Sequence, residues 1–238
     1  MKFIVAEEIF QKLPNACFGV VMARGLKNDR PPPAVAQAFE AALAAAQARF
    51  QSAKVKEFPE IAPYRDAFRT LGINPNKYPC SIEALFSRIA KGKGLPAINP
   101  IVDLGNAVSL AHVVPIGAHD LEGAQDDKDD IMVRLAEVGD IFTPFGAAES
   151  EAPEIGEAVY AVGNVVRTRR WTWRQSEIGK ITPSTTDVFF PIDGFAGFNE
   201  TSVLAARDAI AESLTALFGV APIVGFVDAA HPEMALNG

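Results

Sequence analysis

Few of the residues that build most catalytic and metal centres occur in this sequence. Its 238 residues include only 2 cysteines and 3 histidines. Cys17 and Cys80 are far apart in the sequence and form no C-x-x-C pattern, so we expect two free thiols in a reducing compartment. The histidines, His112, His119 and His231, lack the spacing of zinc ligands, so we expect no protein-bound metal.

Signature motifs of the common enzyme classes are absent as well. The sequence has no G-x-S-x-G nucleophile motif, no Walker A motif and no G-x-G-x-x-G dinucleotide fingerprint, so we expect no cofactor. The acidic run at 125–130 resembles part of a calcium-binding loop. It lacks the glycine at the sixth position of an EF-hand loop, which favours a solvated turn instead.

Long apolar segments and an excess of basic residues are also missing. No apolar segment approaches the ~20 residues of a membrane-spanning helix, so we expect no membrane partner. Glu7 and Glu8 stand where an export signal would continue apolar, so we expect a cytoplasmic protein. The net charge of −7 opposes general binding to nucleic acid, because such binding depends on neutralising phosphates. We expect no DNA partner, and any contact with RNA must come from a local basic cluster.

Apolar periodicity and turn residues predict a mixture of helices and strands. Helical spacing predicts helices at 34–53, 61–71, 82–90 and 101–112, and a long final helix from about residue 200, with Ser81 as the N-cap of the third. Alternating or β-branched segments predict strands at 3–6, 17–25, 131–135, 187–194 and 220–227, and a strand pair with a Gly-Asn turn at 160–167. The tail around His231 is expected to be loose. Since no regular βαβ alternation occurs, the predicted fold class is α+β, with mixed β-sheets and flanking helices.

The chain is long enough for one large domain, and no convincing linker divides it. We predict a single domain over residues 1–238. Within it, residues 1–70 form an N-terminal extension packed on the core, 71–218 form the core, and 219–238 form a closing strand and tail.

Residues 95–120 form the first of two segments with a functional pattern. On the expected helix, Asp103, Asn106 and Ser109 share one side because they follow one another at i, i+3 and i+6. A short strand-like run follows and ends in Ala118, His119 and Asp120. A polar helix edge beside such a strand end is suited to be the wall and lip of a pocket. The alternative is a buried helix with a capped exit loop.

Residues 167–175 form the second segment, which is the densest basic cluster of the chain and contains both tryptophans. As a strand, it would place Arg167, Arg169, Trp171 and Trp173 on one side, and Arg170 and Arg174 on the other. Arginine interleaved with tryptophan suits a phosphate or an unstacked base. It equally suits a structural cation–π arrangement on a sheet.

Two further basic residues, Lys91 and Lys93, follow the third predicted helix. They are candidate phosphate contacts. The alternative is a pair of solvated charges at the C-terminal end of a helix, where positive charge is favourable.

A family resemblance is visible in the order of residues at 99–110, Asn-Pro-Ile-Val-Asp-Leu-Gly-Asn-x-Val-x-Leu, and at 115–120, Pro-Ile-Gly-Ala-His-Asp. It continues through Ser-Ile-Glu-Ala-Leu-Phe-Ser-Arg at 81–88 and through 131–142, and covers about 71–218. This pattern resembles the editing domain of the bacterial phenylalanyl-tRNA synthetase beta subunit, which comprises the third and fourth modules of that subunit. The synthetase's catalytic and anticodon-binding regions have no counterpart here, so the chain resembles a free-standing editing module.

The resemblance implies removal of wrongly attached tyrosine from phenylalanine tRNA. It aligns Asp103 and Asn106 with an aspartate and an asparagine of the family's motif. The family's pocket histidine is replaced by Gly117. His119 lies two positions later and would return to the same face of a strand. The family's glutamate that reads the tyrosine hydroxyl falls near residues 191–192, and Asp193 is the nearest carboxylate.

Three functional hypotheses follow. The first is a trans-acting aminoacyl-tRNA deacylase, whose expected catalytic residues are Asn106 and His119 and whose expected substrate-binding residues are Asp103, Gly117, Asp120, Trp173, Arg174 and Asp193. The second is a non-catalytic module that binds tRNA or another RNA through Arg167, Arg169, Arg170, Lys91 and Lys93. The third is a binder or hydrolase of small amino-acid derivatives.

Overall fold

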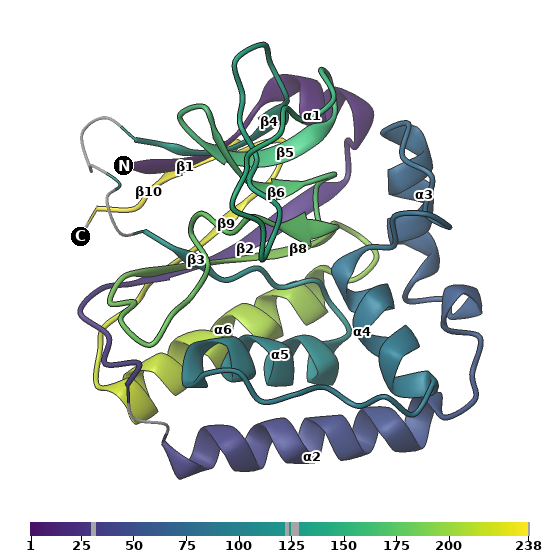
Figure 1. Cartoon of the computed structure of the whole chain (residues 1–238), viewed down its shortest axis with the longest axis vertical. Helices are drawn as coiled ribbons and strands as arrows, with labels where there is room; N and C mark the ends of the chain where they lie inside the picture. The colour runs from purple at the N-terminus through teal and green to yellow at the C-terminus, as the bar shows by residue number, and fades with distance from the viewer. Residues whose placement is uncertain (30–31, 122–123, 125–128, 238) are drawn as a thin grey trace.

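Two β-sheets lie face to face, and a layer of helices covers the outer face of one of them (Figure 1). The computed structural model describes residues 1–29, 32–121, 124 and 129–237. Most of the acidic run at 125–130 therefore lies outside the described residues, and the calcium-loop hypothesis is not tested. Within the described residues, no helix is long and apolar enough to cross a membrane.

The first sheet joins the beginning and the end of the chain. Its six strands run in the order β10 (Glu233–Ala235), β1 (Lys2–Val5), β4 (Ile131–Leu135), β5 (Ala158–Val162), β6 (Val165–Arg169) and β7 (Arg174–Gln175). Only β1 and β4 are parallel. The predicted hairpin with its Gly-Asn turn is confirmed as β5 and β6. The expectation of a loose tail is wrong, because β10 pairs with β1 along residues 233–235.

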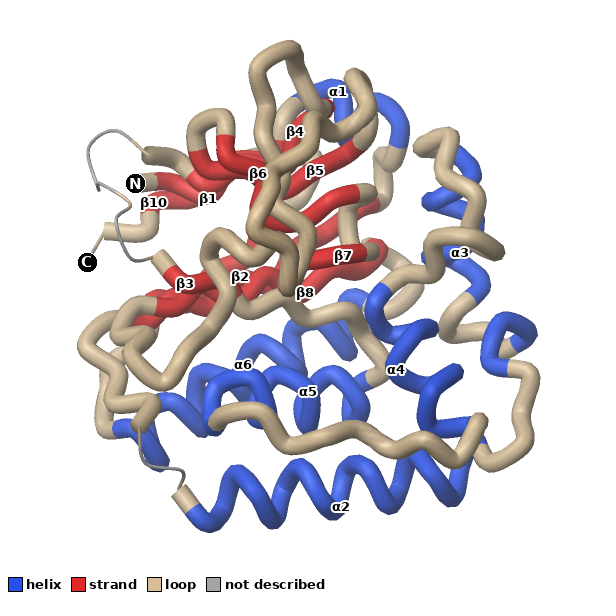
Figure 2. The backbone as a smooth tube through the Cα atoms, in the orientation of Figure 1, coloured by secondary structure: helices blue, strands red, loops and turns tan. Residues whose placement is uncertain are grey.

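The second sheet lies between the first sheet and the helices (Figure 2). Its strand order is β3 (His119–Asp120), β8 (Val188–Phe195), β2 (Ala16–Ala23) and β9 (Ile223–Val227), and all neighbours are antiparallel. Strands β2 and β8 are buried along their whole length because both faces of this sheet are covered.

Three long helices form the outer layer. They are α2 (Pro33–Phe50), α5 (Pro100–His112) and α6 (Glu200–Phe218). Asn99 caps α5, since its side chain accepts a hydrogen bond from the Val102 N–H at 3.0 Å. Helix α6 packs on β2 and β8, and α5 packs against both α6 and α2. The predictions of these three helices are confirmed.

Smaller helices close one end of the sheets. They are α1 (Glu7–Lys12), the 3-10 helix η1 (Val55–Glu57), α3 (Ala62–Thr70) and α4 (Ser81–Ala90). Cys80, not Ser81, occupies the N-cap position of α4, so the predicted cap was wrong by one residue. The backbone N–H of Ser81 instead donates to the Thr172 carbonyl at 2.8 Å, which ties α4 to the loop after β6.

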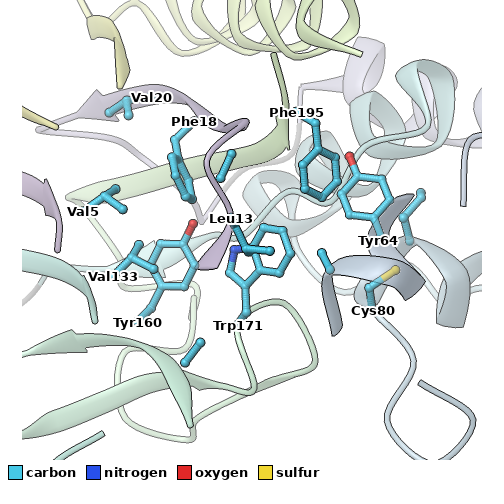
Figure 3. Close-up of a cluster of buried hydrophobic side chains, with 14 of the residues drawn as sticks. Val5, Leu13, Phe18, Val20, Tyr64, Cys80, Val133, Tyr160, Trp171 and Phe195 are labelled. Atoms are coloured by element: carbon cyan, nitrogen blue, oxygen red, sulfur yellow. The ribbon is translucent and has the colours of Figure 1, made fainter. Parts of the chain in front are cut away.

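Two apolar cores lie on opposite faces of the second sheet. Phe189 of β8 faces the first sheet, whereas Phe190 faces the helices, as the two-residue period of a strand requires. Figure 3 shows the core between the sheets, where Phe18, Tyr160 and Trp171 gather. Both cysteines are buried free thiols.

Candidate functional site

A cavity of about 90 Å³ opens where the edge strands of the two sheets meet. Its wall includes β7 of the first sheet and the segment that leads into β3 of the second. The Gln175 amide donates to the Ala118 carbonyl at 2.7 Å and so joins the two sheets at this rim. The residues that line the cavity are Ser81, Pro115, Ile116, Gly117, His119, Tyr160, Thr168, Trp171, Thr172, Trp173, Arg174, Gln175, Pro191 and Asp193.

The floor of the cavity contains a buried carboxyl group, that of Asp193. Its Oδ1 accepts two hydrogen bonds, from the Tyr160 hydroxyl at 2.6 Å and from the Trp171 indole N–H at 2.7 Å. Figure 3 shows these two donor atoms close together. Burial raises the pKa of Asp193 to about 7, although both donors act in the opposite direction. No partner of Oδ2 is found among the described residues.

His119 forms a second polar part of the lining. Its ring stacks on Tyr160 with centroids 5.9 Å apart, so Tyr160 lies between His119 and Asp193. Burial, together with the positive charge of Arg167, lowers the pKa of His119 to about 3, so the imidazole is neutral at pH 7. The buried Nδ1 has no hydrogen-bond partner in the described part of the chain.

The His119 ring fills the space that a side chain at position 117 would occupy. A Cβ added to Gly117 would lie 2.9 Å from His119 Nε2 and 3.0 Å from Pro191 Cγ. A side chain at position 117 and the His119 ring therefore compete for the same space, so the glycine at 117 allows the imidazole to line the cavity.

Two strained residues shape the opposite wall. Arg170 and Trp171 have φ angles of 49° and 58°, a left-handed conformation that is uncommon for any residue other than glycine. The turn is fixed by a hydrogen bond from the Trp171 N–H to the Ala158 carbonyl at 2.6 Å. Strand β6 ends at Arg169, so the predicted strand alternation through Trp173 was wrong. The turn directs the Trp171 indole inward, onto Asp193.

The two arginines at the end of β6 are buried in ion pairs. Arg169 contacts Glu157 at 2.7 Å and Glu151 at 2.5 Å, and Arg170 contacts Glu154 at 3.0 Å. Their charges are neutralised inside the fold, which argues against the expected contacts with RNA phosphates.

Aromatic rings also hold the Arg170 guanidinium. Its Cζ lies 4.0 Å from the ring centre of Tyr78 and 5.0 Å from that of Trp173. The structural cation–π alternative is thus correct for Arg170. The Trp173 ring in turn forms part of the cavity lining.

The remaining basic candidates are in different environments. Arg167 is buried, and burial lowers its pKa, so it is not a surface contact either. Lys91 and Lys93 are exposed after α4, at the opposite end of that helix from the cavity-lining Ser81. Arg174 is exposed and lines the cavity.

Three of the expected site residues do not line this cavity. Asp103 and Asn106 lie on α5, which packs on the far face of the second sheet because its apolar side is buried there. Asp103 Oδ1 accepts a hydrogen bond from the Ile98 N–H at 2.9 Å, so it stabilises the loop before the helix. Asp120 accepts a hydrogen bond from the Thr185 hydroxyl. Their assignment to a common pocket with Trp173 and Arg174 was wrong.

The residues that hold Asp193 were not predicted from the sequence. Tyr160 and Trp171 bind its carboxyl group, and Tyr64 donates to its backbone carbonyl at 2.9 Å. Asn199 donates to the Tyr64 hydroxyl at 2.7 Å. The one available signal was a carboxylate inside an otherwise apolar strand, since such a group requires donors.

Comparisons with known proteins give one family match and one similar solved structure. A family model described as "B3/4 domain" matches residues 63–214, well over half of the chain. A solved N-terminal fragment of the phenylalanyl-tRNA synthetase beta subunit from Pyrococcus horikoshii is similar at 14% identity with a TM-score of 0.45. The match covers 92% of this chain and 49% of that fragment, so the chain spans about half its length. No curated protein matches the chain significantly. The chain belongs to the B3/4 domain family.

Proposed function

We propose that this protein is a trans-acting deacylase that holds the aminoacyl group of a mischarged tRNA in its cavity and hydrolyses the ester. The main support is a single small cavity in which a buried carboxyl group and a neutral imidazole meet, at Asp193 and His119. A concave site with a few convergent polar groups and shifted pKa values is the usual form of a site that binds and acts on a small group.

The size of the cavity limits what enters it. About 90 Å³ is far below the several hundred Å³ of pockets that enclose drug-sized ligands. In this proposal only the aminoacyl group enters, and the tRNA stays outside. Arg174 and the half-buried Trp173 at the mouth supply a cation for a phosphate and an aromatic face for a terminal base.

The chemistry demanded of the site is modest because an aminoacyl ester is already activated. The oxygen of a water molecule attacks the carbonyl carbon, and the bond from that carbon to the ribose oxygen breaks. His119 accepts a proton from the water and returns it to the leaving ribose oxygen. Because an imidazole with a pKa of about 3 is a weak base, most of the rate enhancement comes from placing the water and the ester.

A deacylation assay tests this proposal. The purified protein is incubated with a panel of mischarged aminoacyl-tRNAs, and release of the amino acid is measured. We expect turnover of at least one member, and a loss of roughly 100-fold in rate for His119→Gln. Asn106→Ala, which alters a residue outside the cavity, serves as the control and keeps the wild-type rate. Absence of turnover across the whole panel would refute the proposal.

A second candidate is a hydrolase of small aminoacyl esters that needs no RNA. It is favoured by the net charge of −7 and by the burial of Arg169 and Arg170, which removes two arginines of the densest basic cluster from the surface. Comparing an aminoacyl-tRNA with the ethyl ester of the same amino acid separates the two. A preference for the tRNA ester that weakens steeply with salt supports the first candidate, since phosphate contacts are salt-dependent.

The RNA-binding hypothesis without catalysis now depends on the exposed cations alone. Among the candidate cations, Arg174, Lys91 and Lys93 are exposed and remain available to phosphates. Lys91 lines a groove of about 480 Å³ together with Lys54 and Lys56. Salt-dependent tRNA binding without amino-acid release would support this hypothesis in place of the deacylase.

A further inference from the structure

The carboxyl group of Asp193 is buried without any cation to balance its charge. It is 2% exposed, and its two hydrogen bonds come from neutral donors, the Tyr160 hydroxyl and the Trp171 indole, both to Oδ1. A buried carboxylate normally has a cationic partner or is protonated, because an unpaired charge is costly in an apolar environment. Among the described residues, Oδ2 accepts no hydrogen bond, and because Asp193 lines the cavity, a ligand there can supply one.

The titratable groups around Asp193 are neutral at pH 7. Tyr160 of β5 and Tyr64 of α3 have pKa values raised well above the ordinary value by burial. Burial raises the pKa of Cys17 of β2 to about 12, and lowers that of His119 of β3 to about 3. Among the described lining residues, the one fixed positive charge is that of Arg174, at the mouth.

A ligand is thus the natural source of the missing cation. We infer that Asp193 recognises the free α-ammonium group of an aminoacyl ligand, so that the cavity accepts primary amines and rejects N-acylated derivatives. The inference rests on the proposed function for the identity of the ligand as an aminoacyl group. An ammonium group gives Oδ2 a charge-assisted hydrogen bond, whereas an N-acylated nitrogen is neutral and bulkier.

The position of Arg174 agrees with a ligand that has opposite charges at its two ends. The guanidinium at the mouth attracts a carboxylate or phosphate, while Asp193 at the floor attracts the ammonium group. Such an arrangement orients the ligand with its amino group inward and its ester or carboxylate outward.

Binding of a cation to Asp193 has a measurable proton linkage. With a pKa of about 7, the free carboxyl group is about half protonated at pH 7, and an ammonium ligand drives it to the ionised form. Binding is therefore expected to release roughly half a proton per ligand at pH 7. Calorimetry in two buffers that differ in ionisation enthalpy measures this number.

The binding experiment uses a panel of amino-acid amides and their N-acetylated counterparts, which cannot be turned over as esters. We expect at least one amide to bind with release of a proton, and its N-acetyl form to bind at least about 10-fold more weakly, the equivalent of 1.4 kcal/mol. Equal binding of the two forms, binding without proton release, or absence of binding by every amide would overturn the inference.

Asp193→Asn tests the residue itself. Asparagine keeps an oxygen for the Tyr160 and Trp171 donors but has no charge, so the preference for the free amine and the proton release should both disappear. Asp208→Asn, an exposed carboxyl group on α6, is the matched control and should change neither. If Asp193 only anchors Tyr160 and Trp171, Asp193→Asn will retain the preference.

Failure of this inference is distinguishable from failure of the proposed function. Selective amide binding without release of amino acid from any tRNA would leave the amine recognition standing and remove the deacylase. Equal hydrolysis of an aminoacyl-tRNA and its N-acetylated form would leave the deacylase standing and remove the amine recognition.

Discussion

The two segments that stand out in the sequence differ in how they contribute to the cavity. Residues 95–120 contain the regular helix α5, whose polar edge packs away from the cavity, and only their last part, 115–119, lines it. Residues 167–175 contain an irregular turn with two consecutive left-handed residues between β6 and β7, and six of the cavity's lining residues, Thr168 and 171–175, belong to them. The irregular segment, rather than the regular helix, builds the site.

This difference shows that a regular helix and a binding cavity form for different physical reasons. An α-helix buries an apolar face, and its polar residues serve to cap and tether it, as Asn99 and Asp103 do. A turn held in a strained conformation places a side chain where no regular element would place it, as with Trp171.

The largest expected effect is on the free energy of unfolding, and it differs between these two segments. Trp171→Ala removes a buried indole and a donor to Asp193, and we expect a loss of about 3–5 kcal/mol in the free energy of unfolding. Asn106→Ala on α5 should cost less than about 0.5 kcal/mol. Urea denaturation of both variants measures these values. Similar losses in the two variants would contradict the comparison.

The second prediction concerns the buried arginines. Arg169→Ala leaves Glu157 buried with only the more distant Arg170 guanidinium, 3.6 Å away, so we expect a loss of about 3–5 kcal/mol in stability. Lys91→Ala alters an exposed side chain and should leave stability unchanged within about 0.5 kcal/mol. Thermal denaturation tests both. A stable Arg169→Ala protein with weakened tRNA binding would restore the RNA-contact hypothesis for that residue.

The third prediction compares a glycine that lines the cavity with a glycine on helix α5. A Cβ at Gly117 would approach His119 Nε2 to 2.9 Å, so Gly117→Ala should cost about 1–3 kcal/mol and reduce ligand binding. A Cβ at Gly105 on α5 would meet only Phe190, at an ordinary 3.6 Å. Gly105→Ala should therefore gain up to about 1 kcal/mol through helix propensity. A gain in both variants would show that the His119 ring does not need the space at position 117.

Two opposing effects appear in the dependence of stability on pH, and they largely offset each other in the wild type. The pKa of Asp193 is about 7 in the folded protein against 3.8 as its ordinary value, so the folded state binds more protons and stability falls as pH rises between these values. The pKa of His119 is about 3 against 6.5, so the unfolded state binds more protons and stability rises with pH over that range. The two slopes oppose each other in the wild type.

Single variants should reveal each slope. Asp193→Asn should become more stable as pH rises from 4 towards 6.5, whereas His119→Gln should become less stable as pH rises from 4 towards 7. Denaturation midpoints measured across this range test the signs. Parallel slopes in the two variants would contradict the burial of one or both groups.

Much of the fold could be predicted from the sequence because its elements have clear periodic signals. The hairpin β5–β6, the strands β2 and β8 and the helices α2, α5 and α6 all coincide with predicted segments. The short elements α1 and β10 were missed, since their formation depends on contacts with distant parts of the chain. The family resemblance and the α+β class are confirmed, and the subdivision of the chain stays a prediction.

The site was predictable only in part, for a physical reason. Gly117, His119, Trp173, Arg174 and Asp193 line one cavity, as their grouping in the sequence hypotheses implied, although their roles there stay predictions. Asp103, Asn106 and Asp120 were misplaced, because periodicity indicates which residues share a face but not which neighbour that face meets. The burial of Arg169 and Arg170 was not predicted, because their carboxylate partners lie 12–18 residues away in a loop without a periodic signal.

Amino-acid release by three proteins measured side by side tests the central claim most directly. The wild type, Asn106→Ala and Asp193→Asn are assayed against the same panel of mischarged tRNAs. If the cavity between the sheets is the site, Asn106→Ala matches the wild type and Asp193→Asn loses most of the turnover. Loss of turnover in Asn106→Ala together with full turnover in Asp193→Asn would place the site on α5 and contradict the account.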